Sequence, residues 1–240
     1  VQIHHRDPVV LANCALIQAR LAIELGHLRA GRTLLDEAMT TAQALGQARL
    51  QAAGFTLALE AALQDADIAE GRRIVATYGA HGVVDDRDHW PAVLARWRWM
   101  LGDLTGALAA AHEQRHGHSD LCIRAERSRL LLVSGQYRLA AQTARQVVED
   151  ARVVEVHELA AFARLVAGAA KGVGDDDYAP LVEQTRSSRW VHLYLGGLHL
   201  DAIRRQLRGE NVSPILRQLR SRAQAIGHRL EAIHFRRQPV

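Results

Sequence analysis

Apolar residues recur every three to four positions along almost the whole chain, the period of an α-helix with one buried face. Leu11, Ala15, Ala19 and Ala22 form one such stripe, and no segment alternates convincingly like a half-buried strand. The pattern therefore predicts an all-α fold of 12–13 helices. The helices are expected over residues 8–25, 28–45, 48–65, 68–79, 89–101, 104–116, 119–134, 137–150, 154–171, 178–187, 189–208 and 212–226 and from 229 onward.

Helix boundaries are marked by proline and glycine. Asp7-Pro8 and Ser213-Pro214 place a capping side chain before a proline in the first helical turn. Glycines such as Gly46 and Gly102 stand just after apolar-periodic runs, where a helix ends. The connections are short, so consecutive helices are expected to form antiparallel pairs.

A short motif recurs at the turns. It consists of a small residue, a polar residue, a bulky apolar residue, two variable positions and a second small residue. Its copies start at Gly26, Ala66, Gly102 and Gly135, with spacings of 40, 36 and 33 residues. Such a period indicates stacked helical units that bury their apolar faces on one another. The small positions are expected where helices pack closely, and the bulky position is expected to seal the turn.

The repeat resembles the tetratricopeptide repeat, a helix–turn–helix unit of about 34 residues. The matching residues are Ala19, Gly26, Leu28, Gly31 and Leu35 in the first unit, Ala95, Gly102, Leu104, Ala107 and Ala111 in the third, and Ser128, Gly135, Tyr137, Ala140 and Ala144 in the fourth. The resemblance implies a right-handed α-solenoid of antiparallel helix pairs. It covers one domain over 1–240, regular over 8–150 and less regular over 151–240.

Two longer phrases, Leu34–Gly46 and Ala223–Ala232, resemble repeats of large bacterial ATP-dependent transcriptional activators. In that family a helical-repeat sensor lies between an ATPase module and a DNA-binding module. The chain begins without Met and carries neither a phosphate-binding loop nor a helix-turn-helix reading head. The resemblance therefore implies a sensor fragment of a longer regulator, acting in signal transduction without contacting nucleic acid itself.

The repeat register also predicts a binding surface. In tetratricopeptide-like solenoids the first helix of each pair lines the concave face, and its central outward positions meet the ligand. The corresponding residues are Arg20, Glu60, Arg96, Arg129 and Arg164. Trp99 and Met100, beside Arg96, are candidates for an apolar anchor. Guanidinium groups in this array suit carboxylates or phosphates. The alternative is that these arginines only solvate exposed helix faces.

His112-Glu113-Gln114-Arg115-His116 matches a zinc-binding pattern, because histidines four residues apart share one face of a helix. Arg115 would place a cation beside the metal, and Gly117 would cut the helix. A solvated or capping role is therefore favoured over a metal site at His112, Glu113 and His116. No cofactor is predicted.

Composition limits the remaining classes. The net charge is +4 and the pI about 9.6, but Lys171 is the only lysine, so the basic character is not taken to indicate nucleic-acid binding. Cys14 and Cys122 lie within helical patterns and are expected to be buried free thiols in a reducing cytoplasm. No apolar run is long enough to span a membrane, and no signal segment is apparent.

The sequence thus favours a non-catalytic sensor scaffold that binds a protein, a peptide or a small anionic ligand. A stand-alone adaptor that captures a peptide is the second hypothesis. A zinc-dependent hydrolase is the third. Homo-oligomerisation is left open.

Overall fold

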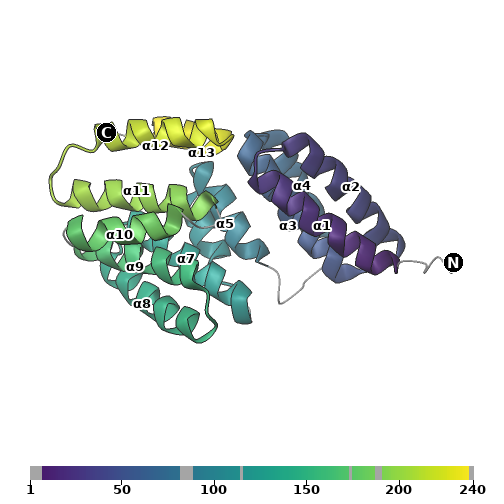
Figure 1. Ribbon diagram of the computed structural model, residues 1–240, viewed down its shortest axis with the longest axis horizontal. Coiled ribbons are helices and arrows are strands. Elements are labelled where there is room, and N and C mark those ends of the chain that lie inside the picture. Colours follow the sequence, from purple (N-terminus) through teal and green to yellow (C-terminus); the bar gives the residue numbers. More distant parts are fainter. Residues whose placement is uncertain (1–6, 82–88, 114–115, 173–174, 187–190, 238–240) are drawn as a thin grey trace.

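The computed structural model of the chain describes residues 7–81, 89–113, 116–172, 175–186 and 191–237. Within these residues the fold is all-α, with thirteen helices and no strand (Figure 1). The helices are α1 (Pro8–Glu24), α2 (Leu28–Ala44), α3 (Ala48–Asp65), α4 (Ile68–His81), α5 (Trp90–Met100), α6 (Leu104–Ala110), α7 (Gly117–Val133), α8 (Tyr137–Val153), α9 (His157–Lys171), α10 (Asp175–Arg186), α11 (Val191–Leu207), α12 (Ser213–Ala225) and α13 (Arg229–Arg237).

The predicted helices are confirmed in number and in most of their boundaries. The clearest difference is α6, which ends at Ala110 rather than at residue 116. His112 and Glu113 beyond it are exposed and polar, so a further turn would have no apolar face to bury.

The Asp7 cap is confirmed, because its Oδ1 accepts a hydrogen bond from Val9 N at 2.9 Å. The Ser213 cap is wrong: Ser213 is already helical, and its N–H donates to Asn211 Oδ1.

The recurring turn motif has one backbone geometry. At Gly102, φ is +92°, its N–H donates to Trp99 O, and the Asp103 N–H donates to Arg98 O. This pair of bonds satisfies the last carbonyls of a helix and requires the left-handed region that glycine adopts without strain. Gly26 and Gly135 make the corresponding pairs of bonds. Ala66 adopts the same conformation, at φ +59°, in spite of its Cβ.

The small positions of the motif lie where helices pack closely, as predicted. Gly31, Gly71, Ala107 and Ala140 are all buried. A Cβ at Gly31 would lie 2.7 Å from Ile23 Cγ1 of the preceding helix, so only glycine permits this approach.

The bulky positions fit the prediction less well. Leu28 and Leu104 pack partly buried against the core. Tyr137 is 41% exposed and Ile68 38% exposed, so these two side chains do not seal their turns.

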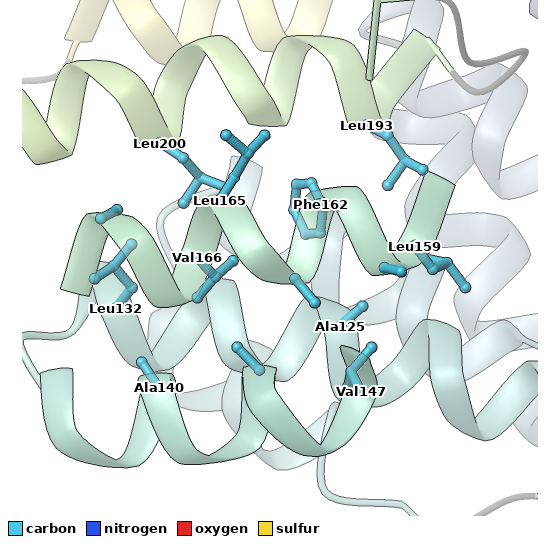
Figure 2. Packing of buried hydrophobic residues seen from close by; sticks show 14 of the residues in the cluster. Ala125, Leu132, Ala140, Val147, Leu159, Phe162, Leu165, Val166, Leu193 and Leu200 are labelled. Carbon is cyan, nitrogen blue, oxygen red and sulfur yellow. The ribbon is translucent and has the colours of Figure 1, made fainter. Parts of the chain in front are cut away.

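Buried apolar residues gather in successive clusters along the chain. The largest joins α7, α8, α9 and α11, and Figure 2 shows Phe162 and Leu165 of α9 between the flanking helices. A second cluster, built mainly on α3 and α5, includes Leu230 of α13. Helix α13 thus packs back against α3 and α5, and Figure 1 shows α12 and α13 extending along α11 towards the N-terminal helices. This closure covers a surface that an open stack of helix pairs would expose.

The prediction for the cysteines is partly wrong. Both are free thiols, but Cys14 is exposed and Cys122 is half-buried. Cys14 lies on the face of α1 that carries the exposed side chains of Val10, Ile17 and Leu21, whereas Leu16 and Ile23 face the core. Helical periodicity assigns two apolar faces to α1, and the described part of the chain covers one of them.

Candidate functional site

A partly enclosed cavity of about 110 Å³, lined by both polar and apolar residues, lies between the helices. Every odd-numbered helix from α1 to α11 contributes to its wall, together with His228, which directly precedes α13. The lining residues are Arg20, Ile23, Glu24, Glu60, Gln64, His89, Ala92, Val93, Arg96, His118, Cys122, Ala125, Glu126, Leu159, Phe162, His192, Leu193 and His228. The first helices of the predicted pairs therefore share one surface, and that surface faces inward.

Glu60 of α3 is the acidic centre of one wall. Its Oε1 lies 3.7 Å from Arg96 Nη2 of α5 and 3.7 Å from His89 Nε2. Arg20 Nη2 of α1 lies 3.0 Å from the same His89 nitrogen. This contact joins α1 to the residue that caps the N-terminus of α5.

The surroundings keep Glu60 ionised. Burial acts to raise the pKa of its carboxyl, but contact with His89 and the charges of Arg20 and Arg96 outweigh burial. The pKa of Glu60 consequently lies well below the usual range of a glutamate. Arg20 and Arg96 thus already have a carboxylate near them within the protein.

Arg129 of α7 forms a second internal ion pair. It is 2% exposed and contacts the carboxylate of Glu126, one turn earlier on the same helix. Its guanidinium carbon lies 4.3 Å from the centre of the Trp99 ring, a cation–π contact. Trp99 is 5% exposed and also packs against His234, with ring centres 4.5 Å apart. Trp99 therefore supports an internal arginine.

Of the predicted site residues, the structure brings Arg20, Glu60 and Arg96 to one cavity, with Arg129 held by the cavity residue Glu126. Arg164 and Met100 do not line it. Met100 is buried in the core cluster of α3 and α5, and Arg164 is half-buried on α9.

The expected exposure of the arginines is wrong for Arg96 and Arg129, which are 5% and 2% exposed. The physical reason is that the C-terminal helices close over the inner face. Charge reversal at either position would place a second carboxylate beside Glu60 or Glu126 in a buried environment. Such variants are expected to unfold rather than to report on binding alone.

Several polar atoms at the cavity are buried without a hydrogen-bond partner. They include Gln64 Nε2, Arg96 Nε and His228 Nδ1. Gln64 is 2% exposed and Arg96 5%, so bulk water does not solvate them freely. The arginine and amide atoms are hydrogen-bond donors. Two residues of the cavity wall, Gln64 and Arg96, thus carry buried donors that have no hydrogen-bond partner.

Two of the cavity histidines, His192 and His228, are held neutral by burial. Burial and the nearby charge of Arg96 lower the pKa of His192 well below its ordinary value. The same causes lower the pKa of His228 to about 4. At neutral pH both imidazoles therefore add no charge to the cavity.

A cysteine and a histidine also meet here. Cys122 Sγ lies 3.5 Å from His118 Nε2, one turn away on α7. Burial raises the pKa of the Cys122 thiol to about 12, against the weaker opposing effect of Arg20. A nucleophilic cysteine needs the thiolate, so this pair lacks the activation of a cysteine hydrolase.

The zinc pattern does not form the arrangement that it requires. Helix α6 ends before His112, and His116 is the extended N-cap of α7, with φ −115° and ψ 150°. The two histidines therefore do not share a helix face, and residues 114–115 lie outside the described residues. Across the described part of the chain, no group of three or more His, Cys, Asp or Glu side chains is placed to hold a metal ion.

Sequence reasoning did not assign Gln64, Cys122, Glu126, Phe162 or His228 to the site. A signal existed for the first three. Gln64 follows Glu60 by one turn, and Glu126 and Cys122 precede Arg129 by one and two turns, so they share its helix face. Nothing in the sequence placed His228 here, because that depends on how α13 closes.

The broader comparisons leave the family open. No described helix has the length and apolarity needed to cross a membrane. Comparison with protein-family models, curated proteins and solved structures finds no match to this chain.

Proposed function

We propose that this chain is a non-catalytic binding module that takes a small ligand into the cavity between its odd-numbered helices. The observation that carries the proposal is the cavity itself, where buried donors of Gln64 and Arg96 have no hydrogen-bond partner. Leaving such groups unpaired costs about 1–3 kcal/mol each, and a bound ligand would recover part of that cost. The ligand would contact helices from both ends of the chain and so stabilise their closure.

The size of the cavity limits the ligand. A dry cavity of about 150 Å³ accommodates benzene. At about 110 Å³, this cavity suits a molecule of similar size or smaller, with a handful of non-hydrogen atoms.

The architecture and biological context remain part of the proposal. A right-handed solenoid of tetratricopeptide-like pairs would explain why every odd-numbered helix lines one inner surface. The phrases over Leu34–Gly46 and Ala223–Ala232 favour the sensor region of a bacterial transcriptional regulator. Sequencing the flanks of the gene tests that context. An ATPase module before Val1 and a DNA-binding module after Val240 would support it, and unrelated flanks would refute it.

Ligand binding can be tested by thermal unfolding of the chain with a library of small molecules. Compounds that raise the melting temperature are retested on Ala92→Leu, which adds bulk to a half-buried wall position. The control is Ala30→Leu, on the exposed face of α2. Loss of stabilisation in Ala92→Leu alone supports the cavity as the site. A library without hits, or hits unaffected by Ala92→Leu, contradicts it.

A second candidate function rests on α1. Val10, Cys14, Ile17, Leu21 and Leu25 follow one another at three- to four-residue intervals and are all exposed. An apolar stripe on one helix is the surface that an amphipathic helix of a partner protein recognises. This is the protein-adaptor alternative, moved from the inner surface to the outer edge of the fold.

The stripe is tested by cross-linking in cell extract with Ile17→Asp, compared with Gln18→Asp on the adjacent exposed position. A partner lost only in Ile17→Asp supports adaptor function. A cross-link to a second copy of this chain, or one insensitive to Ile17→Asp, contradicts it.

A further inference from the structure

We infer that the ligand of the interior cavity is a small uncharged molecule with a hydrogen-bond-accepting oxygen and a compact apolar body. The inference rests on the proposed binding function and specifies its ligand class. It replaces the anionic ligand that the arginine array predicts from sequence.

The first argument is charge balance. Arg20, Arg96 and Arg129 are matched by Glu24, Glu60 and Glu126. Arg20 Nε lies 3.9 Å from Glu24 Oε1, Arg96 Nη2 lies 3.7 Å from Glu60 Oε1, and Arg129 contacts Glu126. These three arginines and three glutamates sum to zero charge.

A charged ligand would disturb this balance. An added carboxylate would compete with Glu60 or Glu126 for guanidinium groups that are already paired, and those of Arg96 and Arg129 are buried. Desolvating an ion without a free counter-charge costs far more than desolvating a neutral polar group. The same reasoning applies to a cation, because the glutamates are also paired.

The second argument concerns the polar groups that have no partner. Gln64 Nε2 and Arg96 Nε are donors, and both residues line the cavity. They come from adjacent helices, α3 and α5, which pack directly on each other. A carbonyl, amide or ether oxygen accepts hydrogen bonds from such donors without bringing a charge.

The third argument concerns the apolar wall. Phe162 and Leu159 of α9 and Leu193 of α11 also line the cavity. Figure 2 shows Phe162 and Leu193 in the space between these two helices. The Phe162 ring packs closely on Gly196, because its Cε2 lies only 2.8 Å from the position that a Cβ there would take. A closely packed apolar wall fits a small hydrocarbon body.

The inference is tested with isobutyramide, isobutyrate and isobutylammonium, which have similar hydrocarbon bodies but differ in charge. Their affinities for the full chain are measured by ligand-observed NMR titration near neutral pH. We expect isobutyramide to bind at least about tenfold more tightly than either ion. Equal or tighter binding of isobutyrate would overturn the inference in favour of an anion site.

A variant assigns the contact. Gln64→Met removes the amide donor at similar volume and should weaken isobutyramide binding several-fold, whereas Gln18→Met on the exposed face of α1 should not. Equal binding to Gln64→Met and the parent chain would overturn the assigned contact.

The two levels of the proposal fail differently. If only charged library compounds bind in an Ala92→Leu-sensitive manner, the cavity is a binding site and the inferred ligand class is wrong. If neither the probes nor any library compound binds there, the proposed function itself fails.

Discussion

Asp65 and Arg229 come from distant parts of the sequence, yet Asp65 Oδ1 lies 3.1 Å from Arg229 Nη1. The second oxygen of Asp65 lies 3.2 Å from Arg32 Nη2, so one carboxylate at the end of α3 contacts both α2 and α13. Beside this contact, Leu230 is buried in the cluster built on α3 and α5. The closure of α13 onto α2 and α3 thus has a charged outer contact and an apolar inner one.

The apolar contact should dominate. The Arg229 side chain is 70% exposed, so Arg229→Ala is expected to cost at most about 1 kcal/mol of unfolding free energy. Leu230 is 3% exposed, and Leu230→Ala is expected to cost about 2–4 kcal/mol. Urea unfolding of both variants checks this order. Equal losses would mean that the ion pair, rather than burial, holds α13 in place.

Among the described residues, two that are not glycine adopt the left-handed conformation, and both offer stabilising changes. Ala66 and Glu155 end α3 and α8 at φ +59° and +57°. Replacing either with glycine should raise the unfolding free energy by about 0.5–1 kcal/mol, because the Cβ strain is removed. Ala30→Gly on the exposed face of α2 is the control and should lower it by about 1 kcal/mol. A loss of stability in Ala66→Gly would contradict the turn geometry.

Two glycines on α4 make a matched pair. A Cβ on Gly71 would lie 2.2 Å from Cη2 of the buried Trp97, whereas a Cβ on Gly79 meets nothing within 4 Å. Gly71→Ala should therefore destabilise the protein by about 1–3 kcal/mol. Gly79→Ala should stabilise it by about 0.5–1 kcal/mol through helix propensity. Thermal or urea unfolding measures both, and the same sign for both would refute the packing of α4 on α5.

These contacts show which parts of the fold were accessible from sequence. Helical periodicity and the glycine after each apolar run are local signals, and they located most helix ends. The register of the repeat also brought Arg20, Glu60 and Arg96 to one surface, because that prediction needed only the helix face and the order of the pairs.

What the sequence could not provide depends on distant contacts. The burial of Arg96 and Arg129 follows from α13 packing on α3 and α5, and no local pattern near residue 229 indicates that partner. The ion pair of Arg129 with Glu126 could have been predicted from the sequence, because Glu126 precedes Arg129 by one helical turn. The zinc pattern was misleading for a local reason, because two histidines share a face only where a helix forms.

Glu231 should make stability depend on pH. It is 1% exposed, its Oε2 has no hydrogen-bond partner, and burial raises its pKa to about 7. An unfolded glutamate titrates near pH 4.5, so between about pH 4.5 and 7 the folded state binds more protons than the unfolded state. This group's contribution to stability therefore falls as the pH rises through that window.

Glu231→Gln keeps the shape of the protonated side chain and removes this dependence. The unfolding free energy of the variant minus that of the parent chain should be about 2 kcal/mol larger at pH 8 than at pH 5. Urea unfolding of both proteins at the two pH values measures this difference. Glu183→Gln, whose side chain is 68% exposed, is the control and should show no such trend. If the difference in unfolding free energy between Glu231→Gln and the parent chain stays constant across this range, the raised pKa of the buried Glu231 carboxyl is contradicted.

The two thiols should differ sharply in reactivity. Cys14 is exposed on α1, whereas burial raises the pKa of Cys122 to about 12. At pH 8 the thiolate fraction of Cys122 is then on the order of 10⁻⁴, and the thiolate is the reacting form.

Titration of the native chain with an aromatic disulfide reagent should modify one thiol quickly and the second only after denaturation. Cys14→Ser should abolish the fast phase, and Cys122→Ser should leave it unchanged. A fast phase that survives in Cys14→Ser would mean that Cys122 is reachable and ionised, which would reopen the Cys122–His118 pair as a reactive site.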